Sequence, residues 1–343
     1  MKQYISALLL FILTGCLLSC EKDIAFKGTI TDPLLVLNSL LTPDSVVSVH
    51  LSQSRFILGD IKPFTPISDA NVSLFVNGSL KEQLTHDANG QYMGTYIPKA
   101  GDEVKIEVKA NGYDPVSSQT VIPHNPNVVV NDSTVTVEKK ENETPNQPNT
   151  IFKTRRRNMQ VQLKLTDAAD QENYYYIKAT INFYRHGELV MQEDIKLKLS
   201  ELLKNNSADS ENIFEDVFGD GGTTDRTENL FSDAHVNGKE VLFDFNFDDT
   251  LESSKYVNGE KVESSQDDEL IVEYIIEIAE ISKDFHLYIV SGNKAANAED
   301  AGFSEPIQVH SNIQNGLGIL GAYNSYRFVS RFESEYYPYY GGR

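Results

Sequence analysis

Short stretches in which apolar and polar residues alternate recur throughout the first third of the chain, as in Val104, Ile106 and Val108. Because successive side chains of a strand point to opposite faces, this period of two predicts strands with one buried face. Turn dipeptides such as Asn77-Gly78 separate the stretches. Strands are expected at 34–41, 46–57, 70–76, 91–97, 103–108 and 110–123. The pattern predicts a mainly β fold whose N-terminal domain, residues 34–125, is a β-sandwich.

The alternation continues in the second part of the chain, where one helical pattern joins it. Strands are expected at 160–165, 174–184, 241–247 and 270–279. Ser282 is a suitable helix N-cap, and the spacing of Phe285 and Ile289 predicts a helix over 283–297. Residues 126–335 are therefore predicted to form a second β-sandwich-like domain, antiparallel and with one helix.

Two polar stretches interrupt this second domain. Residues 138–158 predict a long exposed loop or hairpin tip that ends in Arg155-Arg156-Arg157. Residues 200–230 are an acidic insertion, in which Asp216 could be the first ligand of a calcium loop. The spacing fails, because Thr227 stands where such a loop needs a glutamate. We therefore interpret the insertion as a solvated loop without a metal. The three arginines are compatible with a site for an acidic partner or a phosphate, but a basic triplet that leads into a strand is more often a solvated face, and we interpret them in that way.

The N-terminus has the layout of a secretory signal, with Met1-Lys2 before an apolar core and small residues before a cysteine. Leu17-Leu18-Ser19-Cys20 resembles the bacterial lipoprotein box, whose cysteine is acylated and becomes the first residue of the mature chain. Leu13-Thr14-Gly15-Cys16 also fits, but the chain turns polar immediately after Cys20. We expect a lipoprotein signal peptide at 1–19, lipid attachment at Cys20 with Cys16 as the alternative, and a lipidated tether at 20–33.

Composition narrows the functional classes. The 343 residues carry a formal charge of −20, which argues against nucleic acid and against electrostatic docking on anionic lipid. Both cysteines lie in the signal region, which leaves the mature chain no disulfide and no thiolate for metal or nucleophilic chemistry. The histidines show no nucleophile arrangement with a serine or a carboxylate. The sequence thus predicts a non-enzymatic protein without a cofactor or metal.

Motifs along the mature chain carry a family resemblance. They are 306–323 near the C-terminus, Asp167-Ala168-Ala169-Asp170 with Asn173-Tyr174-Tyr175, Leu230-Phe231-Ser232-Asp233 with Asn237-Gly238-Lys239, and Val49-His50-Leu51-Ser52 with 67–72. Together they resemble a large family of Bacteroidota lipoproteins, the domain of unknown function 4249. The N-terminal sandwich at 34–125 also resembles immunoglobulin-type or transthyretin-type modules, two topologies that strand alternation and turns do not distinguish. The glycines within 315–321 are expected to serve a tight turn or a close backbone approach.

The resemblance implies a lipid-anchored protein of the outer membrane, with the cell surface favoured over the periplasmic side. Its implied partners are the bilayer, through acylated Cys20, and a TonB-dependent receptor, beside which it acts as a non-enzymatic accessory or scaffold in nutrient uptake. A surface glycan-binding protein or adhesin is the alternative, in which the tyrosine-rich tail 336–343 offers stacking faces. Ser45, Ser133 and Thr250 each follow an aspartate in a short triplet that resembles the O-glycosylation acceptor of this phylum.

Overall fold

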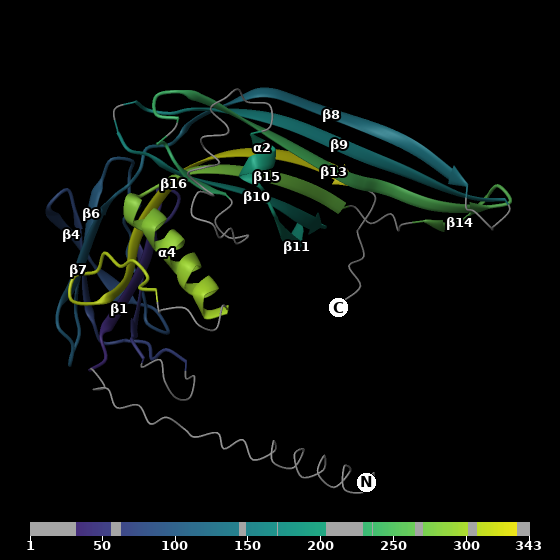
Figure 1. Ribbon diagram of the computed structural model, residues 1–343. Coiled ribbons are helices and arrows are strands. Elements are labelled where there is room, and N and C mark those ends of the chain that lie inside the picture. The colour runs from purple at the N-terminus through teal and green to yellow at the C-terminus, as the bar shows by residue number, and fades with distance from the viewer. Residues whose placement is uncertain are drawn as a thin grey trace, which may run out of the picture.

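The computed structural model describes residues 32–55, 63–143, 149–169, 171–203, 229–234, 236–264, 270–300 and 307–334. The chain is mainly β, as the alternation predicts. Its strands form two sheets in a β-sandwich-like arrangement, accompanied by one long helix (Figure 1). Two large clusters of buried apolar residues fill this arrangement, one from the N-terminal strands and one from the later strands.

The N-terminal strands enclose the first core. They are β1 (Leu35–Leu41), β2 (Ser48–Gln53), β3 (Asn71–Val76), β4 (Ser79–His86), β5 (Gln91–Met93), β6 (Glu103–Lys109) and β7 (Val116–Val121). Their spatial order is β1-β2-β5-β4-β3-β6-β7. Leu37 and Val49 from one end of this path are fully buried in the same cluster as Leu74 and Ile106 from the other. The path therefore folds back on itself and closes around an apolar interior.

The second core lies between two layers of strands. One layer contains β10 (Tyr174–Arg185), β11 (Glu188–Ile195), β12 (Leu230–Ser232), β15 (Leu270–Ile281) and part of β16 (Leu317–Ser334). The other contains β8 (Asn127–Glu143), β9 (Thr150–Thr166), β13 (Glu240–Val257) and β14 (Glu260–Ser264), in the order β14-β13-β9-β8. Leu163 and Phe243 of the four-stranded layer pack in one cluster with Ile177 and Ile276 of the opposite layer. A single helical turn, α2 (Leu199–Leu202), adds leucines to this core.

β16 belongs to both cores. Its first residues pair in parallel with β1, from Val36 opposite Leu317 onward. From Tyr323 onward it pairs antiparallel with β15. Because side chains alternate along a strand, one face of β16 supplies Leu320 to the first core and Phe328 to the second. A single strand thus spans the whole β-structure.

A buried hydrogen bond fixes the point where β16 passes from one core to the other. Asn324 lies at this point and is 8% exposed. Its side-chain amide donates to the carbonyl of Pro123, at 3.1 Å, in the segment between β7 and β8. The connection between the N-terminal strands and the later ones is therefore attached to the strand that both share.

The long helix α4 (Lys283–Asp300) covers the face of the second layer that points away from the core. Ala279 and Ile281 are buried there, with Phe285 and Ile289 of the helix packed against them. The backbone N–H of Ser282, just before the helix, donates to Ala322 O at 2.8 Å, and its hydroxyl accepts from Ala322 N at 3.1 Å. These bonds set the start of α4 against β16.

Most expected strands are confirmed to within a few residues, and so is the helix, which extends to Asp300. Of the two alternatives for 138–158, the long loop was wrong, and the segment is the outer end of a β-hairpin. β8 continues to Glu143 and β9 begins at Thr150, because each strand satisfies the other's backbone groups whatever its side-chain polarity. Of the expected insertion, residues 204–228 lie outside the described ranges. The division at residue 126 stays a prediction, with β16 connecting its two sides.

Candidate interaction surface

The four-stranded layer extends beyond the core that it covers and forms a projecting ribbon (Figure 1). On β9 the buried apolar residues of the second core end at Met159, whereas the strand begins at Thr150. On β13 they end at Phe247, whereas the strand continues to Val257. We call the outer part, residues 131–143, 150–157 and 249–264, the β-ribbon.

An ion pair with a buried arginine closes the core where the β-ribbon begins. The Arg157 guanidinium donates to Asp249 Oδ2 at 2.5 Å, and the Tyr274 hydroxyl donates to the same oxygen at 2.6 Å. The guanidinium carbon lies 3.9 Å from the ring centroid of Phe332, within the range of a cation–π contact. Burial, assisted by the Asp249 charge, raises the pKa of the Tyr274 hydroxyl, so that group stays protonated and keeps donating.

Arg157 corrects the interpretation of the basic triplet as a solvated face, because its side chain is only 4% exposed. Arg156 does fit that interpretation, since its side chain is 43% exposed and pairs with Asp248 at 2.7 Å on the outer face. The two neighbours alternate between the faces of β9, which a composition-based analysis of the triplet cannot distinguish.

Cross-strand contacts hold the β-ribbon together beyond the core. β13 and β14 are joined by the turn Asn258-Gly259, both at positive φ, as a two-residue hairpin turn requires. Asn258 N donates to Asn149 O at 2.9 Å, which connects this turn to the end of the β8–β9 hairpin. Lys153 pairs with Glu141 across β8 and β9 at 2.7 Å. The β-ribbon is therefore a hydrogen-bonded sheet that continues beyond the apolar residues of the second core.

β8 is an edge strand of this sheet, paired with β9 on one side only among the described residues. Nearly its entire length is exposed, including Val135 at 44% and Val137 at 52%. Thr134 and Thr136 alternate with these valines, so the middle of the edge consists of β-branched residues. An exposed edge of this kind can pair with an extended segment of another chain.

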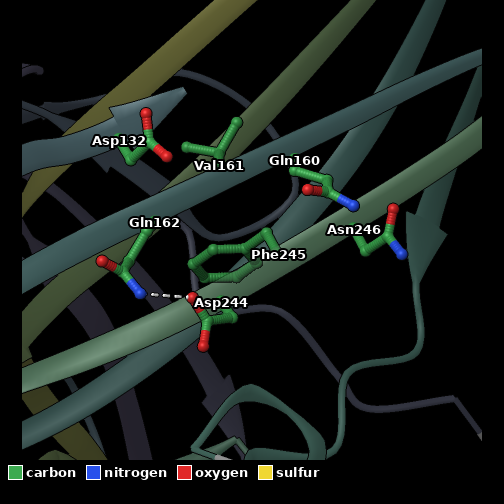
Figure 2. A pocket seen from close by; sticks show the side chains of 7 residues that line it. All are labelled: Asp132, Gln160, Val161, Gln162, Asp244, Phe245 and Asn246. Carbon is green, nitrogen blue, oxygen red and sulfur yellow. Dashed lines mark hydrogen bonds between the residues drawn. The ribbon is translucent and has the colours of Figure 1, made fainter. Parts of the chain in front are cut away.

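A shallow polar hollow of about 260 Å³ lies on the outward face at the base of the β-ribbon (Figure 2). Gln162 donates to Asp244 Oδ1 at 2.6 Å across β9 and β13, and Asp132 of β8 lies at the rim. Asn131, the extra residue at a β-bulge of β8, also donates to Gln162. Amide and carboxylate side chains next to the free edge add polar contacts to what the edge itself can offer a partner.

The two central motifs meet in a separate buried polar cluster. Tyr175 donates to Asp167 at 2.5 Å, and the Asn173 amide donates to Glu280 at 2.9 Å. Burial, reinforced by the charges of Asp167 and Asp233, raises the pKa of Glu280 to about 7. Burial also raises the pKa of Asp233, whose Oδ2 has no hydrogen-bond partner among the described residues. Across the described ranges, no group of three or more His, Cys, Asp or Glu side chains could hold a metal ion.

The C-terminal motif serves the fold. A Cβ on Gly318, which has φ +106°, would lie 2.1 Å from Leu37 O, so β1 and β16 can approach only at a glycine. The Asn312 side chain pairs with the backbone N–H and C=O of Leu320, each at 3.0 Å, and Asn312 O accepts from the Ser118 hydroxyl. The expectation of a close backbone approach is confirmed, and the motif attaches β16 to the N-terminal strands.

The other predicted site residues are spread over the molecule. Ser45 is exposed between β1 and β2, Ser133 is exposed on β8, and Thr250 is partly buried on β13, so the structure does not bring them together. Cys16, Cys20 and the tail 336–343 lie outside the described residues. Within the described part of the chain, no helix is both long and apolar enough to span a membrane.

The free edge of β8 is the feature that the sequence interpretation missed. The run Thr134-Val135-Thr136-Val137 is rich in β-branched residues and was the available signal. Neither its pairing on one side only nor its projection beyond the core follows from that run, because both depend on where β9 and β15 end.

Fold and surface together define a mainly β protein built from two sheets, with a projecting ribbon and an exposed edge strand. The chain belongs to the family described as "Domain of unknown function (DUF4249)", whose model matches residues 21–328. The match includes every strand up to most of β16. Among curated proteins, none matches the chain.

Proposed function

We propose that the protein is a non-enzymatic lipoprotein of the outer membrane, anchored through acylated Cys20, that acts as an accessory or scaffold for a TonB-dependent receptor in nutrient uptake. The observation that carries the partner role is the β8 edge, which exposes Val135 and Val137 on a strand of 17 residues. The lipoprotein box and the family resemblance support the anchor and the location.

The mode of binding follows from the chemistry of the edge. An unpaired strand offers alternating backbone N–H and C=O groups, which an extended partner segment satisfies by adding one strand to the sheet. Such edges are commonly protected by charged residues, and here Glu138 to Glu141 protect only the outer half of β8. The unprotected Thr134 to Val137 segment is therefore the expected centre of the contact.

Substitution of the exposed valines by lysine tests the edge. A lysine at Val135 or Val137 keeps the strand paired with β9 but places a charge where the partner strand would dock. Val262→Lys is the matched control, because Val262 is 56% exposed on the opposite edge strand, β14. We expect Val135→Lys/Val137→Lys to abolish co-purification of the receptor after mild detergent extraction, and Val262→Lys to preserve it.

A photo-crosslinker at Thr136 identifies the partner directly in intact cells. The same probe at Gln83, an exposed residue of β4, controls for random collision. A receptor crosslinked from Thr136 and not from Gln83 is the expected result. Equal crosslinking from both positions, or co-purification that survives the double lysine variant, would refute the edge as the docking site. Cys20→Ala separately tests the lipid anchor. The assignment of lipid attachment to Cys20 is wrong if this variant stays in the membrane fraction and keeps a fatty-acid label.

A further inference from the structure

A groove of about 380 Å³ lies between helix α4 and the outer face of the N-terminal strands. It shares no residue with the β-ribbon. Its floor comes from β1, β2, β5 and β16, and its wall comes from Phe285 and Tyr288 of α4. Figure 1 shows α4 lying beside β16 and β1. The volume falls at the lower end of the range of small-molecule sites in proteins.

Strand register gives the floor a defined row of side chains. Ile319 pairs with Asn38, Asn38 pairs with His50, and His50 pairs with Gln91, so the four residues lie side by side across four strands. Neighbours in such a row have Cβ atoms about 5 Å apart. The row therefore presents an aliphatic side chain followed by an amide, an imidazole and a second amide.

Several polar groups of the groove lack a partner within the protein. The Asn38 amide, the His50 imidazole and the Tyr288 hydroxyl make no hydrogen bond in the described part of the chain. Gln91 differs, because its amide donates to the Ser48 hydroxyl at 2.6 Å, which orients it within the row. Donors and acceptors that are held by a rigid sheet and left unpaired can bind a ligand at little ordering cost.

The charge of the groove narrows the ligand class. The chain carries a formal charge of −20, yet every residue lining this groove is uncharged with histidine neutral. Phe285 and Tyr288 add aromatic side chains opposite the amides of Asn38 and Gln91. A neutral ligand that is hydroxyl-rich on its edges and apolar on its ring faces matches this lining, because it satisfies both kinds of surface.

We propose that the groove binds a neutral saccharide, with a pyranose ring against the aromatic wall and its hydroxyls bonded to Asn38, His50 and Gln91. This site goes beyond the receptor-docking role of β8 and is independent of it. Loss of one does not remove the other, because no residue of the groove lies on the β-ribbon.

Saturation-transfer NMR on purified protein, residues 21–343, tests the proposal with a defined panel of probes. The panel contains the neutral trisaccharides maltotriose, cellotriose, mannotriose and chitotriose, the charged trigalacturonate, and an uncharged capped tripeptide. We expect transfer to ring protons of at least one neutral trisaccharide and none to trigalacturonate. His50→Ala and Tyr288→Ala should each weaken binding by roughly tenfold or more, the loss of one good contact.

Matched variants separate binding from folding. Tyr288→Phe keeps the aromatic face and should retain part of the affinity, whereas Gln83→Ala on β4 should leave it unchanged. The thermal unfolding of each variant is measured first, and binding is compared only for variants whose melting temperature equals that of the parent. The proposal is overturned if no neutral trisaccharide binds, if the peptide or trigalacturonate binds instead, or if binding persists in both His50→Ala and Tyr288→Ala.

Discussion

Replacement of Glu280 by glutamine should change how the stability of the protein depends on pH. Glu280 lies on β15 between Tyr175 of β10 and Asn324 of β16. Burial is the main cause of its raised pKa, the charges of Asp167 and Asp233 add to it, and the hydrogen bond from Asn173 opposes it. The balance shifts the pKa from 4.5 to about 7.

The sign of the effect follows from linkage. The folded protein holds the Glu280 proton more tightly than the unfolded chain, so the contribution to stability is complete below pH 4.5 and is lost as pH rises through about 7. At about 1.4 kcal/mol per pKa unit, the rise from 4.5 to about 7 corresponds to about 3.5 kcal/mol, which solvent screening of the partly exposed carboxyl lowers to about 3 kcal/mol. Glu280→Gln stays neutral and still accepts the Asn173 hydrogen bond, so the variant should avoid this loss.

Urea unfolding measured across the same window tests the reasoning. The parent should lose stability from pH 4.5 to above pH 7, and Glu280→Gln should follow a flatter curve and be the more stable protein at the alkaline end. Asp102→Asn is the control, because the pKa of Asp102 is lowered whereas that of Glu280 is raised. Burial raises the pKa of Asp102, but hydrogen bonds from Tyr96, Lys99 and Asn77 outweigh it and hold the pKa below 3.8, outside the window. Parallel curves for the parent and Glu280→Gln would refute the assignment.

Two further predictions concern stability alone. Arg157→Ala leaves the partly buried Asp249, 23% exposed, without its cation and should cost about 2 kcal/mol in urea unfolding, whereas Arg156→Ala removes only an exposed pair and should cost less than about 1 kcal/mol; equal costs would contradict the burial argument. Gly318→Ala forces a side chain into the β1 backbone and should lower the free energy of unfolding by more than about 2 kcal/mol. Gly292→Ala, in open space on α4, should raise it by about 0.5 kcal/mol, and a similar loss in both glycine variants would contradict the close approach of β1 and β16.

Strands with one solvated face could be predicted from the sequence, and β16 could not. β3 and β6 alternate cleanly because only one of their faces meets an apolar core. β16 is apolar on both faces for part of its length, since Leu320 enters the first core while Tyr323 packs in the cluster under α4. With apolar residues on both faces, the alternation of apolar and polar residues that marks a strand is lost, and the glycines of the same segment favour a turn.

The candidate sites depend on register, which a single sequence does not specify. His50 was already part of a recognised motif, but its neighbours Asn38 and Gln91 become neighbours only through the pairing of β1, β2 and β5. The β8 edge likewise exists because no described strand pairs with its outer side. Arg157 and Arg156 are identical in type and adjacent in sequence, and only the face of β9 on which each lies makes the first arginine buried and the second exposed.

One strand sets the distance between the proposed saccharide groove and the β-ribbon. Ile319 forms part of the groove floor, and Phe332, on the same strand, lies against Arg157 where the β-ribbon begins. Thirteen residues of strand separate them, which places them at most about 43 Å apart at roughly 3.3 Å per residue. Because β16 is hydrogen-bonded to β1 at one end and to β15 at the other, this separation is a property of the sheet and not of a linker. A ligand in the groove and a partner strand on β8 can therefore be bound at the same time, which the proposed role as an accessory protein beside a receptor requires.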